Sequence, residues 1–200
     1  VKTFMDDPLR ILRLLRFLSR YQGSKVDPAA LEAMRQPDVQ QALKQKVSNE
    51  RVLTEWMKMF AGSQQTSALR ILHDTGLWQT LFGEHLKGTA PFTMDQKNKW
   101  HVDNVFEHTL KVVEGFDAIL RADGTGDEER AKALCAAFFH DLGKLCPEII
   151  GIKEHVEREV YQMEYEGGPP VGDDSYTHSY HGHEDESARI SRAILSGLKA

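Results

Sequence analysis

An uncharged apolar run, residues 133–139, leads directly into His140 and Asp141. A run of this kind without alternating polar residues predicts a buried helix. Ionisable groups at such a place are normally paired or bound to a metal, because an unpaired buried charge is strongly unfavourable. An imidazole nitrogen beside a carboxylate oxygen suits a divalent transition metal better than a structural thiolate site. The run and the two residues after it therefore predict a helical fold with a metal-binding pair at the end of one helix.

The pattern of apolar residues is helical nearly throughout, and no segment predicts a convincing strand. Pro residues after Asp7 and Asp27 are typical of helix starts, and Gly76 is typical of a helix end. Gly and Pro at residues 167–170 predict a break, and the polar residues 171–182 predict a loop. We expect an all-α fold with helices near residues 8–21, 28–34, 38–46, 48–62, 66–75, 103–121, 127–142 and 154–165, a short apolar turn at 77–82, and a last helix from about Glu184.

The composition excludes some classes of protein. No run of 18 apolar residues is present, so we expect no membrane span, and the N-terminus lacks the apolar region of a signal peptide. Cys135 and Cys146 are too few and wrongly spaced for a disulfide framework, so we expect reduced, buried thiols in an intracellular compartment, either the cytoplasm or an organelle. The chain begins with Val1 directly before a motif, and we expect it to be a piece of a longer protein.

Charge is distributed unevenly along the chain. Residues 1–87 carry 13 Lys and Arg against 9 Asp and Glu, whereas residues 88–200 carry 12 against 21. At about 100° per residue, four arginines of the first expected helix share one stripe opposite its leucines and isoleucine. These are Arg10, Arg13, Arg16 and Arg20. Such a face suits a polyanion such as RNA or a nucleotide, and a merely solvated helix face is the alternative.

Residues 4–17 resemble the base-selection motif of class II tRNA nucleotidyltransferases and bacterial poly(A) polymerases, which reads acidic residue, Asp, two residues, Arg. Here the motif is Asp6, Asp7, Pro8, Leu9, Arg10. The resemblance implies that Asp7 and Arg10 bind the base edge of CTP or ATP, and that Arg13, Arg16 and Arg20 bind RNA. Asp at i and Arg at i+3 share one helix face, as contact with a base edge requires. The alternative is that Asp7 caps the helix and Arg10 is a surface residue.

Two further segments are similar to this family. Residues 47–52, with Glu55 and Lys58, resemble the motif that braces the base-selection helix, and residues 68–77 resemble the end of the neck region. Nucleotidyl transfer needs paired carboxylates for two metals after a Gly-Ser turn on a sheet, and no such turn or sheet precedes the motif. Asp6 and Asp7 do not replace them, because neighbouring helical residues face different ways. We therefore expect this chain to supply the nucleotide pocket and the RNA-facing neck, and not to transfer nucleotides by itself.

Residues 101–200 resemble the HD-type metal-dependent phosphohydrolases, a module that some bacterial nucleotidyltransferases carry after the neck. The resemblance implies that four residues bind a divalent metal (Mg, Mn or Ni), with His140 and Asp141 catalytic; the four are His108, His140, Asp141 and His183. A metal of this kind polarises a phosphoryl oxygen and activates a water molecule. Lys144 would neutralise phosphate charge, or would be a surface lysine with its head in water.

Other histidines compete for a place in this site. His181 is the alternative to His183, and we expect His101 and His178 in solvent or beside the ligands. The acidic and histidine-rich residues 173–185 are also able to collect metal nonspecifically. The family pattern ends with a further Asp that is not reached before Ala200, so we expect an incomplete HD domain, and the segment between Lys144 and His183 is longer than usual.

These observations predict a helical neck or RNA-binding module at residues 1–87, a linker at 88–100 and an HD-type domain at 101–200. We expect the C-terminal part of a tRNA nucleotidyltransferase or poly(A) polymerase-like protein. Its partners would be tRNA or another RNA 3′ end, CTP or ATP in the full-length protein, and a second copy or a larger ribonucleoprotein. The HD-type domain would hydrolyse 2′,3′-cyclic phosphates, 2′-phosphates and other phosphomonoesters. One alternative is a non-catalytic RNA-binding or scaffold subunit, and another is a signalling-nucleotide hydrolase, which would leave the motif at residues 7–13 without a purpose.

Overall fold

The computed structural model describes residues 1–98, 101–154 and 176–199. Within these residues the chain is almost entirely helical, and the all-α class expected from the sequence is confirmed apart from one short pair of strands. The elements are α1 (Lys2–Asp6), α2 (Leu9–Arg20), α3 (Pro28–Arg35), α4 (Pro37–Lys46), α5 (Asn49–Phe60), α6 (Gln65–Asp74), α7 (Leu77–Phe82), the 3-10 helix η1 (Gly83–Leu86), α8 (Val105–Ala122), α9 (Asp127–Phe139), the 3-10 helix η2 (Leu142–Leu145), β1 (Gly151–Glu154), β2 (Tyr176–Ser179) and α10 (His183–Gly197). No helix in these ranges is long and apolar enough to cross a membrane.

Local sequence signals explain most helix boundaries. Pro28 begins α3, and the Asp27 carboxylate before it accepts a hydrogen bond from the Ala29 N–H at 2.8 Å, as a capping residue does. Gly76 has a φ of 79°, the left-handed conformation that glycine adopts at a helix end, and it separates α6 from α7. The short helix α1 was not predicted, and α2 begins at Leu9 with Pro8, not Asp7, at its N-cap.

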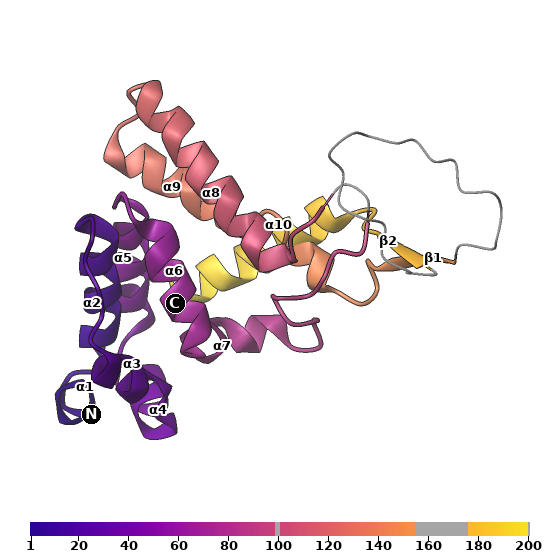
Figure 1. The fold of residues 1–200 in the computed structure, drawn as a ribbon. Helices are drawn as coiled ribbons and strands as arrows, with labels where there is room; N and C mark the ends of the chain where they lie inside the picture. The colour runs from indigo at the N-terminus through magenta and orange to yellow at the C-terminus, as the bar shows by residue number, and fades with distance from the viewer. Residues whose placement is uncertain (99–100, 155–175, 200) are drawn as a thin grey trace.

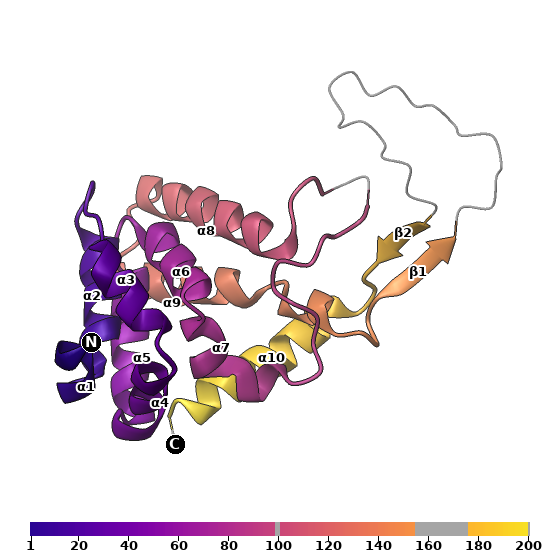
Figure 2. The ribbon, with the colours of Figure 1, turned by 60° about the horizontal axis from the view of Figure 1, so that its bottom comes forward.

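The helices of the N-terminal half lie side by side. α2 packs along α5 and α6, and Figure 1 shows these three helices together at one end of the molecule. α8 and α9 form a hairpin, and α9 also packs against α5. In Figure 2, α10 runs from the two strands back towards the N-terminal helices, and there the Asn49 side-chain amide donates to Gly197 O at 2.9 Å. The two ends of the sequence are therefore parts of one packed body.

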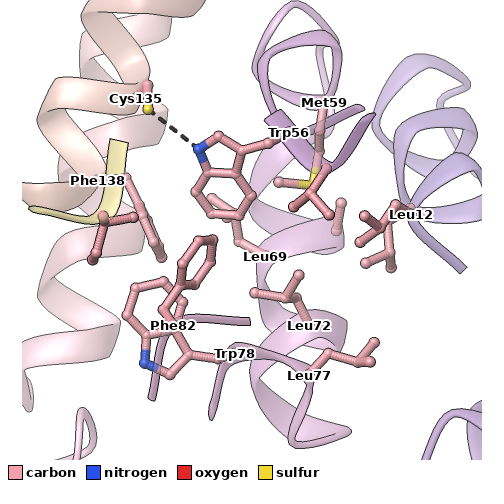
Figure 3. Close-up of a cluster of buried hydrophobic side chains, with 14 of the residues drawn as sticks. Leu12, Trp56, Met59, Leu69, Leu72, Leu77, Trp78, Phe82, Cys135 and Phe138 are labelled. Carbon is pink, nitrogen blue, oxygen red and sulfur yellow. Dashed lines mark hydrogen bonds between the residues drawn. The ribbon is translucent and has the colours of Figure 1, made fainter. Parts of the chain in front are cut away.

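Buried apolar side chains from both sides of residues 88–100 form one cluster. At its centre the Trp56 ring of α5 lies 5.1 Å from the Phe82 ring and 5.7 Å from the Phe138 ring of α9 (Figure 3). The Trp56 indole N–H points at the buried Cys135 thiol, with Nε1 to Sγ at 3.3 Å (Figure 3). α9 lies between α5 on one side and α8 on the other. These two contacts bury Leu134, Cys135, Phe138 and Phe139, whereas Ala136 is exposed, so the apolar run does not mark a helix that is buried on every side.

Three expectations differ from the structure. Residues 151–154 and 176–179 pair as antiparallel strands, with Gly151 opposite Ser179, so no helix begins at Glu154 and the expected loop at 171–182 contains a strand. The remainder of the expected helix at 154–165, and the break at 167–170, lie outside the described residues. The helix expected at 127–142 ends at Phe139, because the chain turns at His140 into η2.

Candidate metal centre

Asp141 is the centre of a cluster of three histidines. Its side chain is 2% exposed, and it stands between the end of α9 and η2. One carboxylate oxygen, Oδ2, lies 3.4 Å from His108 Nε2 and 3.2 Å from His140 Nε2. The other oxygen, Oδ1, lies 3.3 Å from His183 Nε2. The structure therefore brings together all four residues that the sequence indicates as ligands, from α8, from the end of α9 and from the first position of α10.

Backbone carbonyls orient two of these imidazoles. His140 Nδ1 lies 2.7 Å from Ala137 O, and His183 Nδ1 lies 2.6 Å from Tyr180 O. A carbonyl oxygen only accepts hydrogen bonds, so each Nδ1 carries the proton and each Nε2 of a neutral ring presents a lone pair to Asp141. Lone pairs that face a carboxylate need a cation between them. The chemistry of this donor set therefore fits a divalent metal, and His108, His140 and Asp141 have ligand atoms within 4.8 Å of one another.

Lys144 supplies positive charge to the same carboxylate. Its Nζ donates to Asp141 Oδ2 at 2.8 Å and to Gln96 Oε1 at 2.9 Å, and its side chain is 6% exposed. Although burial raises the pKa of Asp141, the adjacent side chains of His140 and Lys144 outweigh it and hold the pKa of this carboxyl well below its ordinary value. The interpretation of Lys144 as a surface lysine is wrong, because η2 turns residue 144 into the protein.

The local environment favours the neutral form of His108. Burial is the main cause that lowers its pKa, opposed by the nearby Asp141, and neutral imidazole is the form that binds metal. α8 presents His108 in its first turn, and the Asn104 side chain caps this helix by accepting from the Glu107 N–H at 2.8 Å. His101 is half-buried, and its ring lies 5.1 Å from the ring of His108. Of the two alternatives expected for His101, the structure thus shows the place beside the ligands.

Glycines position the histidine of α10. Gly182 has a φ of 83° and is the N-cap of α10, so the chain turns sharply just before His183. Gly143 packs on the same turn, and its N–H donates to Ser187 Oγ at 2.8 Å. The neighbouring His181 is exposed, whereas His183 is half-buried beside Asp141. His178 is half-buried with its Nδ1 3.2 Å from the Tyr180 hydroxyl, and residues 173–175 of the acidic run lie outside the described part.

A second group of candidate ligands was not predicted. Cys146, Glu148 and Glu186 have ligand atoms close to one another. Burial, followed by the negative charge of Glu186, raises the pKa of the Cys146 thiol to about 11, and this thiol lies 3.6 Å from Glu186 Oε1. Glu186 is in turn bound by the Arg189 guanidinium. A protonated thiol and a carboxylate already paired with arginine do not favour metal binding.

The arginine stripe of α2 divides into exposed and bound members. Arg10, Arg13 and Arg20 are exposed, and Arg10 Nε lies 3.8 Å from Asp7 Oδ2 at the junction of α1 and α2. Arg16 instead lies against α5, where its Nη1 is 3.1 Å from Glu55 Oε2, and its side chain is 15% exposed. Glu55 belongs to the segment expected to brace this helix. Arg16 thus differs from the other three arginines in that it joins α2 to α5.

Two family models match separate parts of the chain. Residues 25–88 match the probable RNA- and SrmB-binding site of polymerase A, and residues 105–198 match the HD domain. The first match covers α3 to η1, and the second covers α8 to α10 with the histidine cluster. The chain thus carries an RNA-binding region of the poly(A) polymerase type and an HD domain.

The matches to known relatives cover a smaller share of the relatives than of this chain. The chain is 42% identical over 82 residues to tRNA nucleotidyltransferase cca2 of Schizosaccharomyces pombe, which covers 41% of this chain and 17% of that protein. It is 34% identical over 117 residues to the mitochondrial CCA tRNA nucleotidyltransferase of Saccharomyces cerevisiae, which covers 55% of this chain and 21% of the relative. Nucleotidyltransferase lcsQ of Purpureocillium lilacinum is 39% identical over 114 residues, covering 51% and 19%. The chain therefore spans about a fifth of the length of these relatives.

Proposed function

We propose that this chain, which joins an RNA-binding region of the poly(A) polymerase type to an HD domain, acts at RNA 3′ ends within a protein of the CCA-adding or poly(A) polymerase kind. Its first half binds RNA and a nucleotide, and its second half is a metal-dependent phosphohydrolase for 2′,3′-cyclic phosphates and phosphomonoesters. The convergence of three imidazoles on the buried Asp141 carboxylate carries the proposal. Buried free thiols and a mitochondrial relative support an intracellular compartment, the cytoplasm or an organelle.

The residues of the cluster divide the work of hydrolysis. His108, His140, Asp141 and His183 would hold the divalent metal (Mg, Mn or Ni), which polarises a phosphoryl oxygen and acidifies a water molecule when bound. The carbonyls of Ala137 and Tyr180 keep the rings of His140 and His183 in one tautomer. Asp141, kept ionised by Lys144, is placed to orient the water. Lys144 acts on Asp141, because its Nζ is already bonded there and to Gln96.

The first half supplies the contacts to nucleotide and RNA. Arg10 Nε and Asp7 Oδ2 lie 3.8 Å apart. Half of the Arg10 side chain and a third of the Asp7 side chain are exposed, as contact with a base edge would require. Arg13 and Arg20 are exposed for binding to RNA phosphates. Arg16 supports this face through Glu55. The relatives named above support tRNA as the RNA and CTP or ATP as the nucleotide.

The half-buried His183 and the exposed His181 provide a matched test of the metal site. His183→Ala removes one imidazole from Asp141, whereas His181→Ala removes an exposed imidazole two residues earlier. We expect His183→Ala to weaken Mn²⁺ binding by at least roughly 10- to 100-fold, the range for losing a group that only supports a ligand, and to abolish Mn²⁺-dependent hydrolysis of 2′,3′-cyclic AMP. We expect His181→Ala to leave both unchanged. Calorimetry and a phosphate-release assay on this chain measure the two properties separately.

Other outcomes point to different functions. Equal losses in the two variants would show that metal collects nonspecifically along the acidic segment. Mn²⁺ binding without turnover, together with RNA binding, would favour the alternative of a non-catalytic RNA-binding subunit. Turnover that persists when His140 and Asp141 are both changed to Ala would contradict the phosphohydrolase site.

A further inference from the structure

Two aromatic side chains stand in solvent at the edge of the arginine stripe of α2. Phe17 is 48% exposed and Tyr21, which follows the last turn, is 60% exposed. Their rings stack with centroids 6.3 Å apart and planes inclined by 19°. Among the aromatic residues whose burial is described, these are the two that are largely exposed. The aromatic rings of the core cluster, by contrast, are buried or partly buried.

The core-facing side of α2 does not need these rings. Ile11, Leu15 and Leu18 already bury the opposite side of the helix. At about 100° per residue, Phe17 and Tyr21 fall about 20° to either side of Arg10, at the edge of the arginine stripe and outside the buried face. Two adjacent exposed rings of this kind offer a flat apolar surface to a partner.

Positive charge surrounds the pair. Arg10, Arg13 and Arg20 are exposed on the same stripe. Arg10 lies near the Asp7 carboxylate, and the charge of Arg20 helps to lower the pKa of Asp127 in α9. In the described part of the chain, Arg13 forms no ion pair. The Arg16 guanidinium lies 4.6 Å from the centroid of the Phe17 ring and is fixed by Glu55. The ring of Phe17 is thus held in place from below by a buried ion pair.

We propose that Phe17 and Tyr21 form a stacking platform for unpaired bases of single-stranded RNA, with Arg13 and Arg20 bound to the flanking phosphates. Aromatic rings interleaved with arginines suit this ligand, because every base offers a flat face and every nucleotide carries a negative charge. A second copy of this chain suits the face poorly. A symmetric contact would place the arginines of one copy against those of the other. The proposal rests on the proposed function of this region in RNA binding, and it adds the residues and the form of RNA.

The test compares four variants on one RNA. Binding of a fluorescent, unstructured RNA that ends in CCA is followed by anisotropy at several salt concentrations. We expect Phe17→Ala and Tyr21→Ala each to weaken binding roughly 5- to 150-fold, the range for loss of one base–aromatic stack, without changing the slope of affinity against salt. Arg13→Gln should weaken binding and reduce that slope by about one phosphate contact. Tyr21→Trp should bind RNA as well as the unchanged chain, since tryptophan keeps a flat ring at this position.

Controls separate this proposal from its alternatives. Ile119→Ala removes another exposed apolar side chain, on α8, and should leave RNA binding unchanged. A fully paired RNA should bind Phe17→Ala as well as the unchanged chain, because its bases are not free to stack. If Arg13→Gln weakened RNA binding and the two aromatic variants did not, the stacking platform would be overturned. The proposal that this region binds RNA would stand. A chain that binds no RNA would overturn both proposals, and a dimer that dissociates in Phe17→Ala would assign the face to a second copy.

Discussion

Gly143 lies so close to the first turn of α10 that no side chain fits between them. A Cβ at this position would lie 2.2 Å from His183 O and 2.8 Å from Ser187 N. We predict that Gly143→Ala pushes α10, and His183 with it, away from Asp141. Overpacking of this kind costs about 1–3 kcal/mol, so the midpoint of urea unfolding should fall and Mn²⁺ binding measured by calorimetry should weaken.

Gly115 provides the matched control for this substitution. It lies within α8, and a Cβ there would meet no atom within 4 Å. Alanine is more favourable than glycine inside a helix by roughly 0.5–1 kcal/mol, so Gly115→Ala should raise the unfolding midpoint and leave Mn²⁺ binding alone. If Gly143→Ala behaved like Gly115→Ala, the close packing of η2 on α10 would not be what holds His183.

Asp117 predicts how stability responds to acid. Burial opposes its ionisation, but hydrogen bonds from Arg121, Gln65 and Arg130 outweigh burial and lower its pKa in the folded chain. A carboxyl with a lowered folded pKa contributes stability above its unfolded pKa of about 3.9 and loses that contribution as the pH falls through the folded value. Asp117→Asn should therefore lower the melting temperature at neutral pH and flatten its decline below about pH 4. Parallel melting curves for both proteins at every pH would contradict this prediction.

The sequence could predict which histidines gather, because the motif places each on a separate helix end. It could not predict what each surrounding group contacts. The inward direction of Lys144 depends on the end of α9 at Phe139, and the place of His101 beside His108 depends on a segment without periodicity. The role of the four residues as metal ligands stays a prediction. The hydrogen bonds that His140 and His183 donate to the carbonyl oxygens of Ala137 and Tyr180, and that orient the two rings, are visible only in three dimensions.

At the scale of elements, local signals could predict nearly every helix, because capping residues, prolines and glycines act within one or two turns. The strands β1 and β2 were missed because their pairing joins residues 22 to 28 positions apart, and no alternation of polar and apolar residues marks them. Local sequence patterns likewise do not predict which helices contact one another. The clearest case is Arg130 of α9, a buried arginine that the sequence shows only as one charge in an acidic helix start.

Arg130 joins α9 and α8 to the turn between α5 and α6. Its guanidinium donates to Asp117 Oδ1 at 2.6 Å, to Ala61 O at 2.6 Å and to Gly62 O at 3.2 Å, and the residue is 1% exposed. We predict that Arg130→Met lowers the free energy of unfolding by about 3–5 kcal/mol, because it leaves a buried carboxylate and two carbonyls short of a donor. Urea denaturation followed by circular dichroism measures the change.

Arg121 is the matched comparison, because it bonds the same partners from the surface. It donates to Asp117 at 2.8 Å and to Gly62 O at 2.9 Å, with its side chain 42% exposed. Arg121→Met should cost about 1 kcal/mol or less, as exposed ion pairs generally do. Equal losses in the two variants would mean that burial does not set the value of this network.

At the scale of the molecule, the division into modules stays a prediction. The sequence indicates a polar linker at residues 88–100, yet Phe92 of this segment is buried and its ring lies 5.2 Å from that of Trp78. Gln96 is also buried, where its side chain accepts from Lys144 beside Asp141. A polar stretch of sequence indicates exposed residues. It does not reveal whether the residues before and after it share one hydrophobic core.

The shared core predicts that the described helices unfold as one unit. Phe138 of α9 lies 5.7 Å from Trp56 and 5.4 Å from Trp78, both in the N-terminal half. Phe138→Ala should cost about 3–5 kcal/mol as a buried ring is lost, whereas Ile119→Ala, at an exposed position, should cost little. Hydrogen exchange provides the measurement: in Phe138→Ala, the protected amides of α5 and α10 should lose the same free energy, because one cooperative opening exposes both. Loss of protection in α9 and α10 with α5 unchanged would instead establish two units that unfold separately.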